Sequence, residues 1–322
     1  MKLQAPVSEE DIMSHWLYTD KVYISCVCIT FNQELYVRDA IDGFLAQVTE
    51  YKFEIVIHDD LSTDKTRAIL KEYKSRYPSI INLVLQKQNQ YSLGKKIIPI
   101  AANYAEGDYI ALCEGDDFWV DKYKLQRQVK VLLNDKYAGS FSSALTDENR
   151  KVGYQNSKDV DIQYNTLLKY SGDIIPTASL MFNKKVMSTL PPFFDELPIG
   201  DYYLQLLIAS AGEIYYHKDV FSFYRVHSSG SWSLKNSTRT EEVIIKDYHR
   251  YYNSSELFFS FIGQSSLKAI KLLKLNTAVE LFKIRAFKEI KKLIKDLAIF
   301  DFKGKLVIKL IFLKVVCFLY RG

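Results

Sequence analysis

The sequence has few cysteines, and its first residues contain no long apolar run. Only 4 of the 322 residues are cysteine, and none forms a Cys-x-x-Cys pair or lies with histidines at zinc-ligand spacing. This argues against a zinc-binding scaffold and favours a reducing compartment. Cys26 and Cys28 lie two positions apart in an apolar run, so we expect both to be small buried residues on one side of a strand.

Residues 1–20 also lack the continuous apolar stretch that a signal peptidase or translocon recognises. We therefore expect this part of the chain to be cytoplasmic and to form a helical lead-in. With 48% hydrophobic and 25% charged residues, the remainder suits one large α/β domain with a smaller appended piece.

The net charge of +5 hides an uneven distribution. Residues 267–322 carry 14 Lys and Arg against 4 Asp and Glu, a balance of +10, which leaves −5 for the rest. A basic tail on an acidic body favours contact with an anionic membrane surface or an acidic partner. Nucleic-acid binding is disfavoured, because the basic residues are interleaved with helical core positions.

Strand and helix patterns alternate through the first 133 residues. Apolar, β-branched runs predict strands at 22–30, 53–58, 81–85 and 109–113. Helical patterns occupy 35–47, 62–77 with Ser62 as N-cap, 99–105 opened by Pro99, and a segment from Asp121 to Leu133. This order predicts a doubly wound, mainly parallel sheet, which binds ligands beyond the carboxyl ends of its strands.

The pattern becomes mixed after residue 133 and wholly helical from about residue 241. We expect strands at 139–144 and 177–183 and a helix at 201–211. The final apolar segment, 306–320, is shorter than the roughly 20 residues that span a bilayer. It could lie at a membrane interface, dock on the protein or form an oligomer contact, and the surrounding lysines favour the membrane.

Acidic residues follow two of the predicted strands. These are Asp59 and Asp60 after the second strand, and Glu114, Asp116 and Asp117 after the fourth. Adjacent carboxylates repel one another, and a divalent cation is an effective partner for them. For the first group, capping of the following helix remains an alternative. It is a weaker one for the Glu-Gly-Asp-Asp loop, where glycine permits close approach to a ligand.

The stretch from about Val22 to Ser233 resembles the family 2 glycosyltransferases with the GT-A fold, particularly bacterial members that act on surface polysaccharides. Five motifs occur in the family's order: ITFN at 29–32, HDDLSTD at 58–64, EGDDFW at 114–119, IGDY at 199–202 and YRVH at 224–227. The resemblance implies a GT-A domain over residues 21–235, followed by a basic helical region over 236–322.

The resemblance also implies roles on the donor side of the site. Thr30, Phe31 and Asn32 would form the opening turn against a nucleotide-sugar donor, with Phe31 contacting the base ring. Asp59 and Asp60 would belong to the same pocket, and Asp60 would accept hydrogen bonds from the base.

For the diphosphate, the resemblance implies a Mg²⁺ or Mn²⁺ ion. Asp117 would ligate this ion, Asp116 would meet the ion or the ribose, and His227 would be a further ligand or a diphosphate donor. Arg225 could pair with phosphate oxygens. For His227 and Arg225 an ordinary surface role remains open.

Asp201 matches the position of the family's catalytic base. It would take the proton from an acceptor hydroxyl that attacks the anomeric carbon, inverting its configuration. The alternative is a helix N-cap, and the two roles are compatible because a helix N-terminus favours an ionised carboxylate.

These observations favour an inverting glycosyltransferase at the inner face of the cell membrane, using a nucleotide sugar, most simply a UDP-sugar. The acceptor would be a hydroxyl of a cell-surface glycan or a lipid-linked glycan. One alternative is a sugar-1-phosphate nucleotidyltransferase, but residues 30–35 lack the glycines and basic residues of its phosphate loop. The other is a non-catalytic scaffold of the same fold.

Overall fold

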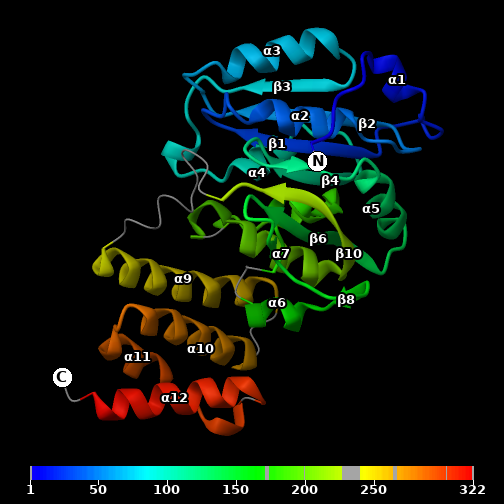
Figure 1. The fold of residues 1–322 in the computed structure, drawn as a ribbon. Helices are drawn as coiled ribbons and strands as arrows, with labels where there is room; N and C mark the ends of the chain where they lie inside the picture. Colours follow the sequence, from blue (N-terminus) through cyan, green and yellow to red (C-terminus); the bar gives the residue numbers. More distant parts are fainter. Residues whose placement is uncertain are drawn as a thin grey trace.

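A computed structural model describes residues 2–170, 174–198, 200–226, 240–263, 267–301 and 303–320. Its first half is a parallel sheet of β1 (Ile24–Thr30), β2 (Phe53–Asp59), β3 (Ile81–Leu85) and β4 (Tyr109–Glu114), in the order β3-β2-β1-β4. Between these strands run α2 (Val37–Leu45), α3 (Thr66–Arg76), the 3-10 helix η1 (Tyr91–Leu93) and α4 (Ile97–Ala102). The four predicted strands and their alternation with helices are confirmed (Figure 1).

The sheet continues beyond β4 with mixed strand directions. The path runs through β9 (Met181–Asn183), β6 (Tyr137–Thr146) and β10 (Glu213–Tyr224) to β5 (Phe118–Trp119), and β7 (Lys151–Val152) and β8 (Val160–Ile162) pair at its side. The strand expected at 177–183 is a 3-10 helix, η2 (Thr177–Ser179), followed by the short β9. The twelve-residue β10 was not predicted, because its polar residues interrupt any simple alternation.

Three helices differ from the expected ones in where they begin or in how long they are. α3 begins at Thr66 rather than after Ser62, because the Ser62 hydroxyl accepts a hydrogen bond from the Asn32 N–H instead of capping a helix. α5 (Lys124–Leu132) begins three residues after Asp121, whose carboxylate accepts the Tyr123 N–H. In residues 2–20 the helical part is only α1 (Glu9–Met13).

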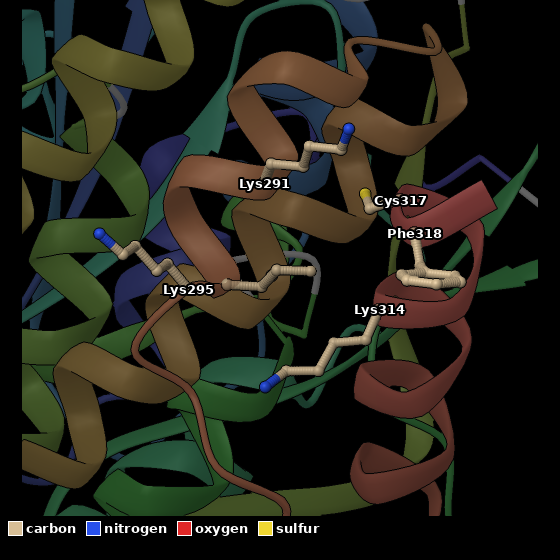
Figure 2. Close-up of a pocket in the computed structure, with 6 residues that line it drawn as sticks. Lys291, Lys295, Lys314, Cys317 and Phe318 are labelled. Atoms are coloured by element: carbon tan, nitrogen blue, oxygen red, sulfur yellow. The ribbon is translucent and has the colours of Figure 1, made fainter. Parts of the chain in front are cut away.

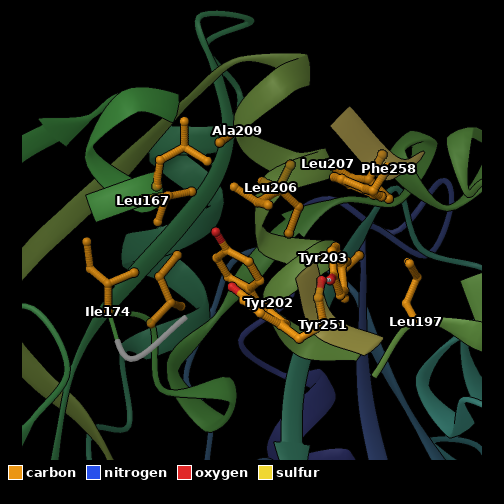
Figure 3. Close-up of a cluster of buried hydrophobic side chains, with 14 of the residues drawn as sticks. Leu167, Ile174, Leu197, Tyr202, Tyr203, Leu206, Leu207, Ala209, Tyr251 and Phe258 are labelled. Atoms are coloured by element: carbon orange, nitrogen blue, oxygen red, sulfur yellow. Dashed lines mark hydrogen bonds between the residues drawn. The ribbon is translucent and has the colours of Figure 1, made fainter. Parts of the chain in front are cut away.

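Two hydrophobic clusters cover the two faces of the sheet. One contains Cys26 and Cys28, both buried on the same side of β1 as predicted, and packs under α2, α3 and α5. The other extends from the opposite face of the sheet through α7 (Gly200–Ala211) into the C-terminal helices. Tyr203 on α7 contacts Phe258 of α9 (Glu241–Phe261), as Figure 3 shows, and its hydroxyl bonds with that of Ser255.

The C-terminal region therefore shares a core with the α/β region. α6 (Tyr164–Tyr170), α9, α10 (Leu267–Lys283), α11 (Phe287–Ile294) and α12 (Lys305–Leu319) stack away from the sheet, and α12 lies at the end of the molecule opposite β3 (Figure 1). Short 3-10 helices complete the order: η3 (Lys184–Thr189), η4 (Phe194–Glu196) and η5 (Ile299–Asp301). Within the described residues, none of the helices combines the length and apolar character that crossing a bilayer requires.

Candidate active site

The carboxyl ends of β1, β2 and β4 meet at one edge of the sheet. Thr30, the last residue of β1, is in register with Asp59 at the end of β2, and Ile29 is in register with Glu114 at the end of β4. The parallel direction of the three strands causes this convergence, because each strand delivers its following loop to the same edge. The expected motifs on residues 29–32, 58–64 and 114–119 therefore adjoin one another.

Asp60 fixes the loop that follows β3. Its buried carboxylate accepts the backbone N–H of Gln90 at 2.7 Å on one oxygen and that of Tyr91 at 2.9 Å on the other. Its own N–H donates to the Thr30 carbonyl at 3.0 Å. Each carboxylate oxygen keeps one further acceptor position, so a nucleotide base would compete with no existing bond.

Asp59 is buried at the same edge. One carboxylate oxygen accepts from Ser62 N–H and from the guanidinium of Arg67, which also donates to the carbonyl of Gln86. The sequence-based alternative of helix capping is thus replaced, for Asp59, by an ion pair with a side chain of α3.

Several buried oxygens at this edge have no hydrogen-bond partner among the described residues. They are Thr30 Oγ1, Gln33 Oε1, Asp59 Oδ1 and Glu114 Oε2. An unpaired buried oxygen is costly, and its presence is accounted for by a ligand, ion or water. Four such oxygens gather around the ends of β1, β2 and β4, each of them covered by protein.

The loop after β1 is tied to the loop after β2. Asn32 has a left-handed backbone with φ of 53°, its N–H donates to Ser62 Oγ, and its side-chain oxygen accepts the Thr63 N–H at 2.8 Å. Asp64 accepts the N–H groups of Glu34 and Thr66. Asn32 and Asp64 therefore shape the turn, and Phe31 is left 46% exposed beside it.

Asp117 lies buried beneath the loop after β4. Its carboxylate accepts the Arg225 N–H at 2.9 Å. Burial raises the pKa of Asp117 well above its ordinary value, and the charge of Asp116 raises it further. A cation near this pair would favour the ionised form.

Arg225 is held by the protein. Its guanidinium donates to the Asp116 carbonyl, forms an ion pair with Asp39, and lies 4.6 Å from the Phe118 ring centroid. In this arrangement the arginine supports the Asp116–Asp117 loop. To pair with phosphate, as the sequence suggested, Arg225 would have to give up its contacts with Asp39 and the Asp116 carbonyl.

Asp201 in the first turn of α7 belongs to the same group of acids. Burial raises the pKa of Glu114 well above its ordinary value. The negative charges that raise its pKa further come, in order of effect, from Asp117, Asp201 and Asp116. The structure therefore brings the Glu-Gly-Asp-Asp loop and Asp201 together, although 84 positions separate Asp117 and Asp201 in the chain.

Lys96 lies beside the start of α7, close to Asp201. No sequence motif indicated this position. Burial raises the pKa of Asp201, whereas the charge of Lys96 and a hydrogen bond with Thr177 lower it. Lys96 lies in a polar loop with no recognisable motif, so its place beside α7 depends on how that loop folds back. The pKa of Asp201 is raised overall, and Lys96 limits that rise.

Gly115 lets the loops after β1 and β4 pack closely. A Cβ at Gly115 would lie 2.4 Å from Gln33 Oε1 and 3.0 Å from Thr30 Cβ, so this glycine permits close packing of two loops.

Among the described residues no group of three or more His, Cys, Asp or Glu side chains has a metal-binding arrangement. His227 lies outside the described residues. Asp116 and Asp117 carry carboxylate oxygens of the kind that Mg²⁺ or Mn²⁺ prefers.

The family is decided by sequence comparison. Residues 25–190 match the model of glycosyl transferase family 2. The chain belongs to this family. The match contains the motifs at strands β1, β2 and β4, and it ends before Asp201.

Curated relatives of this family 2 chain are found in several bacteria. An uncharacterized protein of Mycobacterium tuberculosis is 34% identical over 65% of this chain, which spans 60% of that relative's length. An Escherichia coli protein named UDP-Glc:alpha-D-GlcNAc-diphosphoundecaprenol beta-1,3-glucosyltransferase WfaP is 27% identical over 70% of this chain and 89% of its own length.

Solved structures confirm the fold. TarS of S. aureus in complex with UDP-GlcNAc superposes with a TM-score of 0.55 at 14% identity, over 91% of this chain and 87% of that chain. The mannosyltransferase PcManGT of Pyrobaculum calidifontis, in complex with GDP-Man and Mn²⁺, gives a TM-score of 0.53 at 16% identity, over 94% of this chain and 89% of that chain. The predicted GT-A architecture with a helical C-terminal part is confirmed.

Proposed function

We propose that this family 2 chain transfers a sugar from a nucleotide-sugar donor, a UDP-sugar, to a hydroxyl of a cell-surface glycan or a lipid-linked acceptor. The observation that carries the proposal is the meeting of the carboxyl ends of β1, β2 and β4, which brings Asp59, Asp60 and the loop from Glu114 to Asp117 to one edge of the sheet, with Asp201 near enough to influence the pKa of Glu114. The donor class is supported by TarS, which binds UDP-GlcNAc. The acceptor class is supported by WfaP, whose name gives a diphosphoundecaprenol substrate.

The nucleoside would lie along the ends of β1 and β2. The exposed Phe31 ring is available to the base, while Thr30 and Asp59 lie buried at the strand ends and Asp60 orders the adjoining loop. Asn32 holds the turn on which Phe31 is placed.

Asp116 and Asp117 would hold Mg²⁺ or Mn²⁺, with His227 as a candidate third ligand. A bound cation would neutralise the charge that develops on the departing nucleoside diphosphate. Asp117 would supply a buried carboxylate and Asp116 a partly exposed one, and Arg225 holds their loop in place.

Asp201 would act as the base. Its carboxylate accepts the proton of the acceptor hydroxyl, and that oxygen bonds to the anomeric carbon from the face opposite the diphosphate. The bond between the anomeric carbon and the diphosphate oxygen breaks, so the configuration inverts. Lys96 contributes by favouring the ionised form of Asp201.

The test measures release of nucleoside diphosphate and transfer to acceptor across a panel of nucleotide sugars with Mn²⁺. Asp117→Ala should lose more than about 100-fold of both activities, because several kcal/mol of charge stabilisation depend on the cation. Asp201→Asn should retain donor binding and lose about 10²–10⁴-fold of transfer. The exposed Asp135→Asn is the matched control.

Unchanged metal-dependent release in Asp117→Ala would refute the assignment of the cation. Loss of donor binding in Asp201→Asn would assign that residue to the helix cap instead. Pyrophosphate as the released product would identify a nucleotidyltransferase.

The family assignment also bears on location. We propose that the protein works in the cytoplasm, at the inner face of the cell membrane, where a lipid-linked acceptor would be presented. The basic charge of residues 267–322 supports this placement.

A further inference from the structure

The C-terminal helix α12 is apolar on two opposite faces. Leu310, Leu313 and Cys317 are buried against α10 and α11. The other face carries large apolar side chains that are about half to four-fifths exposed, namely Ile308 67%, Phe312 51%, Val315 51%, Phe318 80% and Leu319 71%. A helix that packs on one side of a water-soluble domain normally turns polar residues outward.

The exposed side chains form one continuous surface. At 100° per residue, positions 308, 311, 312, 315, 318 and 319 fall within one third of the helix circumference, opposite positions 310, 313 and 317. The 3-10 helix η5, which contacts α12, adds Phe300, 92% exposed. Contiguous apolar surface of this kind marks an interaction site.

Lysines border this surface on both sides. By the same helical spacing, Lys305 and Lys309 lie on one flank of the apolar face and Lys314 on the other. The helix from 305 to 319 contains no acidic residue. The exposed Lys305 and Lys309 can keep their ammonium groups among anionic head groups while their methylenes follow the apolar surface.

A shallow cavity adjoins the apolar face. It has a volume of about 280 Å³ and lies between α11 and α12, lined by Lys291, Ile294, Lys295, Lys314, Cys317 and Phe318 (Figure 2). Lys291 donates to the Tyr320 carbonyl and Lys314 to the Leu297 carbonyl, so both ammonium groups are positioned by backbone. The cavity is thus lined by apolar side chains and by the stems of three lysines, whose ammonium groups point away from one another.

We infer that the outer face of α12, with Phe300 and the lysine-lined cavity, is the surface by which this protein docks on an anionic lipid membrane. α12 lies in the plane of the interface, with its apolar face among the acyl chains and its lysines at the head groups. Charge decides between this occupant and a second copy of the chain. A twofold contact through the same face would bring the flanking lysines of both copies to one interface with no acidic residue on α12 to pair with them, whereas anionic lipid neutralises them.

The test is co-sedimentation of the full chain with vesicles of phosphatidylcholine alone or mixed with phosphatidylglycerol. Wild type should bind the anionic vesicles roughly tenfold or more tightly than the neutral ones, and high salt should reduce the difference. Phe318→Ser with Leu319→Ser should lose roughly tenfold or more of the binding to anionic vesicles. Lys305→Gln with Lys309→Gln should lose the preference for anionic vesicles while leaving weak binding to both.

Matched controls lie elsewhere on the surface. Leu17→Ser with Leu133→Ser removes exposed apolar side chains, and Lys71→Gln with Lys130→Gln removes exposed charges. Both controls should bind as wild type does. All substituted side chains are exposed, and circular dichroism verifies that each variant is folded.

Three results would overturn the docking surface: equal binding of wild type to both vesicle types, undiminished binding of the Phe318/Leu319 variant, or a dimer in sedimentation velocity that this variant dissociates. This inference rests on the membrane location proposed above. Vesicle binding is measured without the transfer reaction, so its failure would remove the location and leave the proposed chemistry standing.

Discussion

Lys124 is a buried lysine away from the acidic edge. It is fully buried, its ammonium group lies 4.3 Å from the Trp119 ring centroid, and it donates to Gln128 Oε1 at 2.6 Å. Gln128 in turn donates to the carbonyls of Ser140 and Ser179. This network joins α5 to β6 and η2, and Trp119 is wholly buried within it.

Burial lowers the pKa of Lys124 to about 7, against an ordinary value of 10.5. Between these two values the unfolded chain binds more protons than the folded chain, so this group makes folding more favourable as pH rises. In Lys124→Met that contribution is absent. The free energy of unfolding of wild type should therefore rise relative to that of the variant. The rise should be up to about 1.4 kcal/mol for each pH unit above neutrality.

Urea unfolding at neutral pH and at about two units higher measures this shift, with the exposed Lys122→Met as control. A difference that stays constant with pH would show that the lysine keeps its charge on folding.

The loops after β1 and β2 depend on each other. Besides the bonds of Asn32 and Asp64, the Gln33 N–H donates to Thr66 Oγ1 at 2.8 Å and the Lys65 N–H to Glu34 at 2.8 Å. Thr66 is the first residue of α3 and is fully buried, so the helix and the preceding turn share one hydrogen-bond network. The donor-side residues are thereby held on a rigid support.

Thr66→Val keeps the side-chain volume and removes the acceptor for the Gln33 N–H. The free energy of unfolding should fall by about 1–3 kcal/mol, because a buried donor is left unsatisfied. The exposed Thr63→Val, whose hydroxyl makes a longer 3.3 Å bond, should change it by less than about 0.5 kcal/mol. Chemical denaturation compares the two, and equal effects would mean that the Thr66 hydroxyl contributes nothing specific.

The α/β region and the C-terminal helices form one cooperative body. A single hydrophobic cluster joins Val27 and Val56 in the sheet to Tyr203 on α7, Phe258 on α9 and Leu310 on α12. The Tyr203–Ser255 hydrogen bond adds a polar link within this cluster. A contiguous core of this kind couples the unfolding of its parts.

Thermal unfolding should accordingly show one transition. The tryptophans, Trp16, Trp119 and Trp232, all precede residue 241, whereas α9 to α12 supply much of the helical signal. Tryptophan fluorescence and far-ultraviolet circular dichroism should therefore give coincident curves. Separate midpoints would demonstrate a C-terminal unit that melts independently.

Local patterns were sufficient for the parallel half of the fold. Apolar β-branched runs alternate with helical segments up to residue 133, so the four strands, their direction and the placing of acids at their ends could be predicted. β10 could not, since its twelve residues are held by pairing with β5, β6 and β8, which lie far away in the chain.

The same division holds for the site. Sequence order and motif were enough to assign the family and to place Asp59, Asp60, Asp116 and Asp117 at strand ends, because side chains that follow parallel strands must share an edge. Contacts between distant segments were needed to place Lys96 opposite Asp201, to commit Arg225 to Asp39, and to leave the outer face of α12 uncovered. Such contacts depend on packing in three dimensions, which no local pattern of residues encodes.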